Sequence, residues 1–226
     1  MNTKQIWQWK LSRWLLLAGM LTLLFGGVFA LTRSGAAQQT LNCVPGPHSG
    51  TINADEAWCI GNSPHLITGN VVVLPGVTLT IQEGVTVQTR GGAELQVQGH
   101  LSAIGIANQR ILFTSEVDTG PGQWNGLYLK GGTGDLEHVV VRYAGPNNSD
   151  TYRGNIVARN VLTGELRIIN SEIRDQNLYY YVDVGLNVVD SRVVVSNTLF
   201  TGNGGGVESA NDAPMRIIGA FSVVTM

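Results

Sequence analysis

The sequence predicts an all-β protein whose short strands stack into a parallel solenoid behind an N-terminal export segment. Three observations support this prediction. Apolar and polar residues alternate in short bursts, no window after the leader keeps the i, i+3, i+4 pattern of a helix, and similar segments return at a regular interval along the chain. With 226 residues, of which 43% are hydrophobic, the chain can bury one sizeable core, which favours a single folded domain.

The segment 1–37 is predicted to direct export. Lys4, Lys10 and Arg13 precede an uncharged, largely apolar run over residues 14–31, and small residues follow at 34–37. This order is typical of a secretory signal peptide, cut here after residue 36 or 37. The alternative is an uncleaved anchor, since the apolar run is at the lower limit of length for crossing a bilayer. The basic flank keeps the N-terminus in the cytoplasm, so we expect a secreted body or one anchored at the outer face of the cytoplasmic membrane.

The exported part is predicted to be mildly acidic. The leader holds four of the fourteen basic residues (Lys4, Lys10, Arg13 and Arg33) and no acid, which leaves ten basic and sixteen acidic residues and a net charge near −6. Such a chain lacks the positive charge that attracts nucleic acid. We therefore expect no nucleic-acid partner, and membrane contact only through the leader.

Cys43 and Cys59 are predicted to form a disulfide that closes an N-terminal cap over residues 38–66. Export permits the oxidation, and a bridge over a loop of this length contributes about 3 kcal/mol. A metal site that includes His48 and His65 is the alternative. Because the two cysteines lack the close Cys-x2-Cys spacing of zinc sites, we expect no metal and no cofactor.

From residue 70 onward the alternation of Val, Ile, Leu and Thr with polar residues predicts a series of short strands punctuated by glycine and asparagine. The expected strands are 77–81, 85–87, 95–97, 101–103, 111–113, 127–129 and 139–141, with later ones at 215–218 and 221–224. The last two belong to a coil in progress, and no polar terminal cap follows them. Since an open coil exposes its core, we expect a cap partner or a missing C-terminal segment.

The strands repeat. The segment 166–173 aligns with 193–200 in its inward apolar positions, Leu166 falling on Val193 and Asn170 on Asn197. One coil earlier, the segment 136–139 aligns with the start of the first segment, so that Leu136 falls on Leu166. A unit of about 25–30 residues with three short strands fits one coil of a parallel solenoid. Stacked asparagines suit its bends, because asparagine tolerates the left-handed conformation and its amide can bond to the asparagine of the next coil.

Several segments resemble the right-handed parallel β-helix proteins of the pectin-lyase-like superfamily, and its secreted bacterial members in particular. They are the two early blocks 71–87 and 95–103, the segments 111–115 and 124–127, and the later coils at 166–177 and 193–203. The resemblance implies a right-handed parallel β-helix of roughly six coils over residues 67–226. It does not imply the chemistry of the family's enzymes.

The constellations that those enzymes use are not found in the sequence. It contains no adjacent Asp-Asp pair, no Gly-His-Gly and no Arg-x-Lys. Asp175, Asp183 and Asp190 each fall near a bend, where aspartate usually caps a turn. His100 and His138 lie in different coils and have no serine or cysteine partner at motif spacing. We therefore assign no catalytic residue.

Aromatic residues offer a binding hypothesis. Tyr179, Tyr180 and Tyr181 fall in one expected strand, so at least one ring faces outward. Together with Tyr128, Tyr143, Tyr152 and Trp124 they could form a platform for sugar rings, the alternative being ordinary packing. A loop over residues 146–154 is a second place for binding.

The sequence thus predicts an exported, non-catalytic binding or structural module that contacts polysaccharide or another cell-envelope component. The alternatives are a polysaccharide lyase or glycoside hydrolase of the same fold, and a stalk that displays another domain. Outward acids clustered on one sheet would favour the enzyme, and outward aromatics without acids would favour binding. A surface that lacks both features would favour the stalk.

Overall fold

The computed structural model describes residues 41–145, 154–176, 184–203, 215–218 and 223–225, all within the second of the two units into which the chain divides at residue 41. The predicted export segment over residues 1–37 lies outside the described residues, as do Tyr152, Asp183 and the three tyrosines at 179–181. Within the part that is described, no helix has both the length and the apolar character needed to cross a bilayer.

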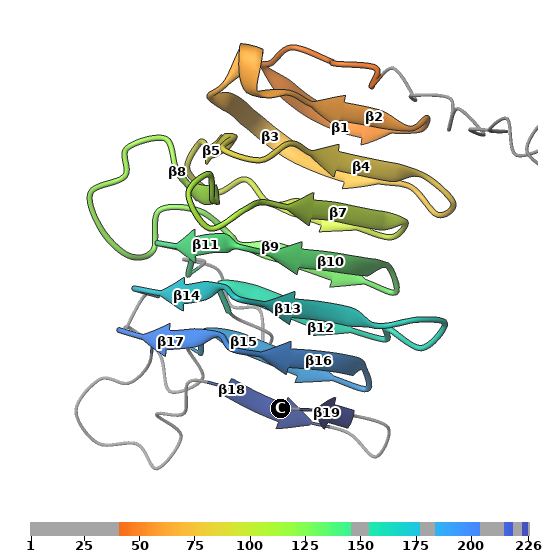
Figure 1. Cartoon of the computed structure of the whole chain (residues 1–226), viewed down its shortest axis with the longest axis vertical. Helices are drawn as coiled ribbons and strands as arrows, with labels where there is room; N and C mark the ends of the chain where they lie inside the picture. The colour runs from red at the N-terminus through yellow and green to blue at the C-terminus, as the bar shows by residue number, and fades with distance from the viewer. Residues whose placement is uncertain (1–40, 146–153, 177–183, 204–214, 219–222, 226) are drawn as a thin grey trace, which may run out of the picture. The chain divides into compact units, whose positions relative to one another are not determined.

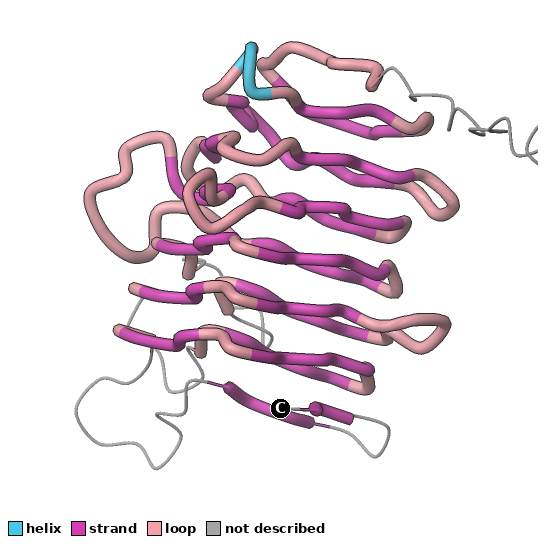
Figure 2. Tube along the Cα trace, in the orientation of Figure 1, coloured by secondary structure: helices cyan, strands magenta, loops and turns pink. Residues whose placement is uncertain are grey.

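The prediction of an all-β fold is confirmed. Nineteen strands and one 3₁₀ turn, η1 (Ile60–Asn62), make up the regular structure of the described residues, and loops join the strands throughout (Figure 2). Alternating apolar residues favour strands because they suit a pleated surface that is buried on one side. The strands are β1 (His48–Ile52), β2 (Glu56–Trp58), β3 (His65–Val73), β4 (Thr78–Ile81), β5 (Thr86–Thr89), β6 (Leu95–Val97), β7 (His100–Ile104), β8 (Ile111–Ser115), β9 (Leu127–Lys130), β10 (Thr133–Glu137), β11 (Val139–Arg142), β12 (Ile156–Arg159), β13 (Leu166–Ile169), β14 (Glu172–Arg174), β15 (Leu186–Val189), β16 (Arg192–Ser196), β17 (Leu199–Thr201), β18 (Met215–Ile218) and β19 (Val223–Thr225).

The strands form two parallel sheets, and from β4 onward each strand pairs with the strand three places further along the chain. The seven-stranded sheet has the order β2–β4–β7–β10–β13–β16–β19, and Figure 1 shows its labelled strands following one another down the molecule. The twelve-stranded sheet has two arms that meet at the long strand β3, which pairs with β5 through its first residues and with β6 through its last. This arrangement is compatible with a parallel β-helix, in which three strands complete one coil.

Inward-facing apolar residues of successive coils stack on one another to form the core. Leu166 pairs with Val193 and Ile168 with Val195, which confirms the predicted alignment of these two coils. All four side chains are buried. The predicted alignment of the preceding coil is wrong, because Leu136 pairs with Ile168 rather than with Leu166.

Gly134 explains the error in the predicted alignment. It is the residue that pairs with Leu166, and it has no side chain to mark the inward face in the sequence. A shift by two positions leaves the inward and outward alternation of a strand unchanged, so the pattern alone does not distinguish the two registers. A Cβ at Gly134 would lie 3.2 Å from Leu129 Cδ2 and 3.4 Å from Leu166 Cδ1, so the glycine leaves room for two leucines.

The coils turn at residues in the left-handed conformation. Asn170 and Asn197 have φ angles of 52° and 46°, and Asn197 Nδ2 donates to Asn170 Oδ1 at 2.7 Å. His138 has the equivalent place one coil earlier, with a φ of 49°. A second corner carries Asn160 and Asp190, with φ angles of 56° and 44°. Asparagine and aspartate recur here because they adopt this conformation at lower cost than most residues.

A hydroxyl residue follows three of these bend positions, Asn170, Asp190 and Asn197. Ser171 Oγ donates to the carbonyl of Ile169 at 2.7 Å and accepts the backbone N–H of Val139, in the coil before, at 3.2 Å. Ser191 makes the same two kinds of bond at the second corner. The hydroxyl thus satisfies a backbone donor at a bend, where strand pairing is interrupted.

Residues 41–66, the described part of the predicted cap, contain the predicted disulfide between Cys43 and Cys59, whose Cα atoms are 5.5 Å apart. Trp58, on β2, is fully buried in the same cap, and its ring stacks on His48 with the centroids 4.1 Å apart. His48 Nε2 lies 2.9 Å from His65 Nδ1, and His65 Nε2 lies 2.9 Å from the carbonyl oxygen of Cys59. Both histidines of the alternative metal site are therefore engaged in hydrogen bonds, and both cysteines in the disulfide.

Candidate functional site

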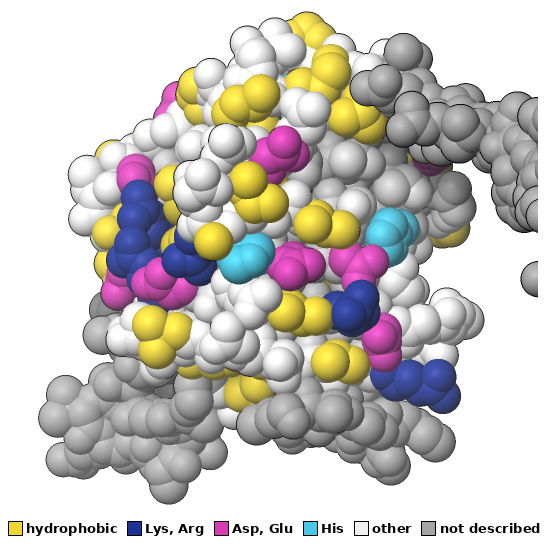
Figure 3. All heavy atoms as spheres, viewed as in Figure 1, with side chains coloured by type: hydrophobic (Ala, Val, Ile, Leu, Met, Phe, Trp, Pro, Cys, Tyr) yellow, Lys and Arg dark blue, Asp and Glu magenta, His cyan; other side chains and the backbone are white. Residues whose placement is uncertain are grey.

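The outer side of the seven-stranded sheet carries a row of polar side chains that we call the polar face. It arises from the strand alternation that buries the apolar residues: every second residue of β4, β7, β10 and β13 faces outward. Figure 3 shows histidine, acidic and basic side chains gathered across the middle of this side of the molecule. The polar face consists of Thr78, Thr80, His100, Ser102, Thr133, Asp135, Glu137 and Arg167.

Hydrogen bonds between coils hold the centre of the polar face. His100 Nδ1 lies 2.9 Å from Thr133 Oγ1, and His100 Nε2 lies 3.6 Å from Asp135 Oδ2. The other oxygen of Asp135 accepts a hydrogen bond from Arg167 Nη1 at 3.3 Å. The side chains of His100 and Asp135 remain about one-third exposed, 34% and 35%. The four residues are thus oriented by one another and still reach solvent.

A groove of about 380 Å³ opens beside His100. Its walls offer hydroxyl groups, a side-chain amide and the imidazole as hydrogen-bonding partners, and proline and valine as apolar surface. The loop before β7 lies close to the loop before β4, since a Cβ on Gly99 would lie only 2.2 Å from the carbonyl oxygen of Val77. The groove is lined by Pro75, Gly76, Val77, Thr78, Gln98, Gly99, His100, Gly131, Thr133 and Thr163.

Two carboxylates stand side by side on the outer side of β10. Asp135 and Glu137 are separated by one residue, so both project from the same face of the strand. Glu137 Oε1 accepts a hydrogen bond from Asn170 Nδ2 at 3.3 Å and lies 4.0 Å from His138 Nε2. The sequence search for adjacent aspartates missed this pair. The signal that could have found it is the pattern Asp-x-Glu in a strand, but the segment 133–137 is not among the expected strands.

The described aromatic residues do not gather into the expected platform. Trp124 is buried in the core with its Nε1 donating to the carbonyl of Arg142 at 2.8 Å, which agrees with the alternative of ordinary packing and not with an outward platform. Tyr128 lies on β9, and Tyr143 follows β11 with the guanidinium of Arg142 5.0 Å above its ring. Neither tyrosine lies on the polar face. The candidates Tyr179, Tyr180 and Tyr181 lie outside the described residues.

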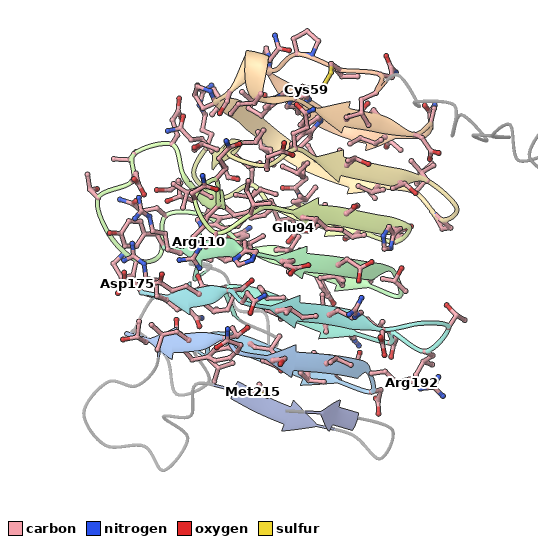
Figure 4. The ribbon with its side chains drawn as sticks, in the orientation of Figure 1. Cys59, Glu94, Arg110, Asp175, Arg192 and Met215 are labelled. Carbon is pink, nitrogen blue, oxygen red and sulfur yellow. A yellow bond between two sulfur atoms is a disulfide. The ribbon has the colours of Figure 1, made fainter. Side chains whose placement is uncertain are left out.

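The predicted turn positions Asp175 and Asp190 have φ angles of 52° and 44°, as a residue at a left-handed bend does. Asp175 also belongs to a charged cluster directly after β14. Arg174 contacts Asp175, and its Nε lies 3.1 Å from Glu172 Oε1. Glu172 Oε2 accepts a bond from Arg110 at 3.1 Å. Figure 4 shows Arg110 and Asp175 on the side away from Arg192. The opposite charges neutralise one another, so the cluster stabilises the corner rather than offering a charged site.

Among the described residues, no group of three or more histidine, cysteine or acidic side chains is placed to hold a metal ion. No protein-family model matches the chain, and comparisons with curated proteins and with solved structures give no significant match. The function is therefore argued from the polar face itself.

Proposed function

We propose that this chain is an exported, non-catalytic module that binds polysaccharide or another cell-envelope component through the polar face. Its fold would be a right-handed parallel β-helix of roughly six coils, of the pectin-lyase-like kind. The parallel sheets, the three-strand period and the resemblance of residues 71–87 and 95–103 support this assignment. The leader over residues 1–37 supports export.

One observation carries the binding proposal: the network that joins His100, Thr133, Asp135 and Arg167. Sugars present hydroxyl groups that donate and accept at fixed spacing, and a row of preoriented carboxylate, hydroxyl, imidazole and guanidinium groups matches that chemistry. A parallel sheet provides a flat and rigid support, so little side-chain entropy is lost on binding.

The test is binding of the purified chain to an array of envelope and plant-type glycans, with two variants. Asp135→Asn removes the charge at the centre of the network and keeps the shape of the side chain. Glu116→Gln removes a similar charge outside the polar face, where Glu116 pairs with Arg90 at 2.8 Å, and serves as the matched control. We expect at least one class of glycan to bind, with a loss of about tenfold for Asp135→Asn, since hydrogen bonds to charged groups contribute about 1.5–3 kcal/mol. An absence of binding to every glycan would overturn the proposal.

Outward acids clustered on one sheet are the feature expected of an enzyme, so the carboxylates of Asp135 and Glu137 favour a second candidate, a glycoside hydrolase. Binding is the first candidate because Asp135 already accepts a hydrogen bond from Arg167 and Glu137 one from Asn170. The Cα atoms of residues i and i+2 in a strand are about 6.7 Å apart, and their side chains project from the same face. Inverting hydrolases hold their two carboxyl groups about 6.5–9.5 Å apart, a separation that two such side chains can adopt. Release of reducing ends from any glycan that binds, abolished by Glu137→Gln, would establish the enzyme. Binding without release of reducing ends supports the module. The absence of both binding and release supports the stalk.

Export is tested separately, by intact mass of the native protein in fractionated cells. A species in the medium that begins at residue 37 or 38 supports a cleaved signal peptide. The full 24.2 kDa chain in the membrane fraction supports an anchor. The full chain in the cytosol would contradict both.

A further inference from the structure

We infer that the polar face selects neutral, linear polysaccharides over polymers of uronic acids, and that the bound chain runs along the stack of coils, across the strands. The inference rests on the proposed function and adds the charge class and the direction of the ligand.

The register of the sheet gives the direction. Thr80 pairs with Ser102, Ser102 with Asp135 and Asp135 with Arg167, so these four outward residues form a single column across four neighbouring strands. Neighbouring strands are about 4.8 Å apart, close to the length of one pyranose unit in an extended chain. A glycan lying along the column therefore brings each successive sugar to the equivalent position of the next coil, which a glycan lying along one strand does not do.

The charges give the ligand class. On β4, β7 and β10 the outward charged groups are the carboxylates of Asp135 and Glu137, together with His100. At the edge of the groove, Asp55 accepts the backbone N–H of Thr78 at 2.7 Å, and Lys130 is exposed one residue before Gly131. The guanidinium of Arg167 is already bound to Asp135 and lies 3.7 Å from Glu165 Oε1. Arg192 begins the strand of the next coil, β16, and so lies beyond the column. A uronate carboxylate placed here meets the carboxylates of Asp135 and Glu137, and the guanidinium of Arg167 is already paired with Asp135 and Glu165. The uronate is therefore repelled rather than clamped.

Hydroxyl groups suit the same positions. A carboxylate only accepts hydrogen bonds, and neutral sugars supply the donors that Asp135 and Glu137 need. The threonines of the groove and the polar face accept and donate in turn. Ile104, on β7 and 49% exposed, lies in register with Glu137 and offers an apolar surface to the C–H side of a sugar ring. No phenylalanine, tyrosine or tryptophan ring projects from the described strands β4, β7, β10 and β13, so hydrogen bonds supply most of the selectivity.

The experiment is calorimetric titration of the full chain at pH 7 and low salt with two sets of probes. The neutral set consists of cellohexaose, xylohexaose and mannohexaose, and the charged probe is hexagalacturonate. We expect at least one neutral hexamer to bind ten times more tightly than the uronate. Asp135→Asn should weaken the neutral ligand about tenfold and reduce the discrimination, whereas the control Glu116→Gln should change neither. Affinity should rise from the disaccharide to the tetrasaccharide, because four coils contribute to the column.

Tighter binding of hexagalacturonate than of every neutral hexamer would overturn the charge argument and leave the glycan-binding function intact. Affinity that does not change between the disaccharide and the tetrasaccharide would overturn the direction of the chain. Binding to none of the four hexamers, combined with a positive glycan array, would overturn this inference alone. A negative array would overturn the proposed function as well.

Discussion

The buried histidine pair of the cap should make the protein sensitive to mild acid. The carbonyl oxygen of Cys59 only accepts, so the proton of His65 lies on Nε2, and its Nδ1 accepts the N–H of His48 Nε2. In the neutral pair His48 Nδ1 is then unprotonated. A proton added to it places a positive charge in a stack where His48 is 7% exposed and its neighbour Trp58 is fully buried. The carboxylate of Glu56 accepts from Trp58 Nε1 at 2.9 Å and is the acid in contact with this stack.

The magnitude follows from the pKa of His48. Burial, and after it the charge of His65, lowers this pKa from 6.5 to about 4. As the pH falls, the unfolded chain takes up the proton first, so the folded state loses stability between pH 6.5 and about 4, while above pH 6.5 the contribution is complete. At about 1.4 kcal/mol for each pH unit between the two pKa values, the loss amounts to about 3 kcal/mol.

The assay is urea denaturation of the full chain at pH 7 and pH 4, for the unmodified protein and for His48→Gln. Glutamine keeps a donor for His65 Nδ1 and does not titrate. Carboxylates titrate in both proteins, so the difference between their two pH effects isolates His48. We expect His48→Gln to lose about 3 kcal/mol less than the unmodified protein. The control His100→Gln removes a partly exposed imidazole and should retain the acid sensitivity caused by His48. An equal loss in the unmodified protein and in His48→Gln would refute the reasoning.

Three further predictions concern stability and are checked by the same denaturation assay at pH 7. Gly99→Ala should lower the free energy of unfolding by about 3 kcal/mol or more, because its Cβ would lie 2.2 Å from a backbone carbonyl oxygen. Gly120→Ala, whose Cβ would have nothing within 4 Å, should be close to neutral, and similar values for both variants would contradict the packing argument. Asn197→Ala should lower the free energy of unfolding by about 1–2 kcal/mol and Asn197→Gly by less, since alanine but not glycine is strained at a φ of 46°. The reverse order would show that the hydrogen bond of the side chain matters more than the backbone conformation. Reduction of the Cys43–Cys59 disulfide should lower the free energy of unfolding by about 3 kcal/mol, and a protein unaffected by reductant would show that the cap is held by its aromatic stack instead.

Much of the fold was predictable from local pattern. Alternation of apolar and polar residues predicted the strands, because each strand buries one face and exposes the other whatever its partner. The disulfide followed from the two cysteines of the chain, and the repeated segments predicted the pairing of Leu166 with Val193. The pairing of the preceding coil was predicted out of register by two positions, since Gly134 has no apolar side chain that would identify it as an inward-facing position.

The candidate site was much less predictable. His100 and Asp135 are far apart in the chain, and they meet because the loop between their coils has the length that brings Ser102 and Asp135 into register. Loop length varies from coil to coil and has no periodic signature, so residue spacing in the sequence gives no warning of the contact. The search for short catalytic motifs could not find a group assembled from different coils.

The sequence by itself determined the class of secondary structure, the alternation of faces and the identity of residues that tolerate left-handed bends, because these depend on each residue and its near neighbours. Only the tertiary structure decided which outward residues became neighbours and which polar residues were buried. His48 and His65 illustrate the second point, since nothing local distinguishes them from exposed histidines until the pairing of β1 with β3 brings them together in a stack with Trp58. Contacts between coils depend on register, and register is set by packing across the whole sheet.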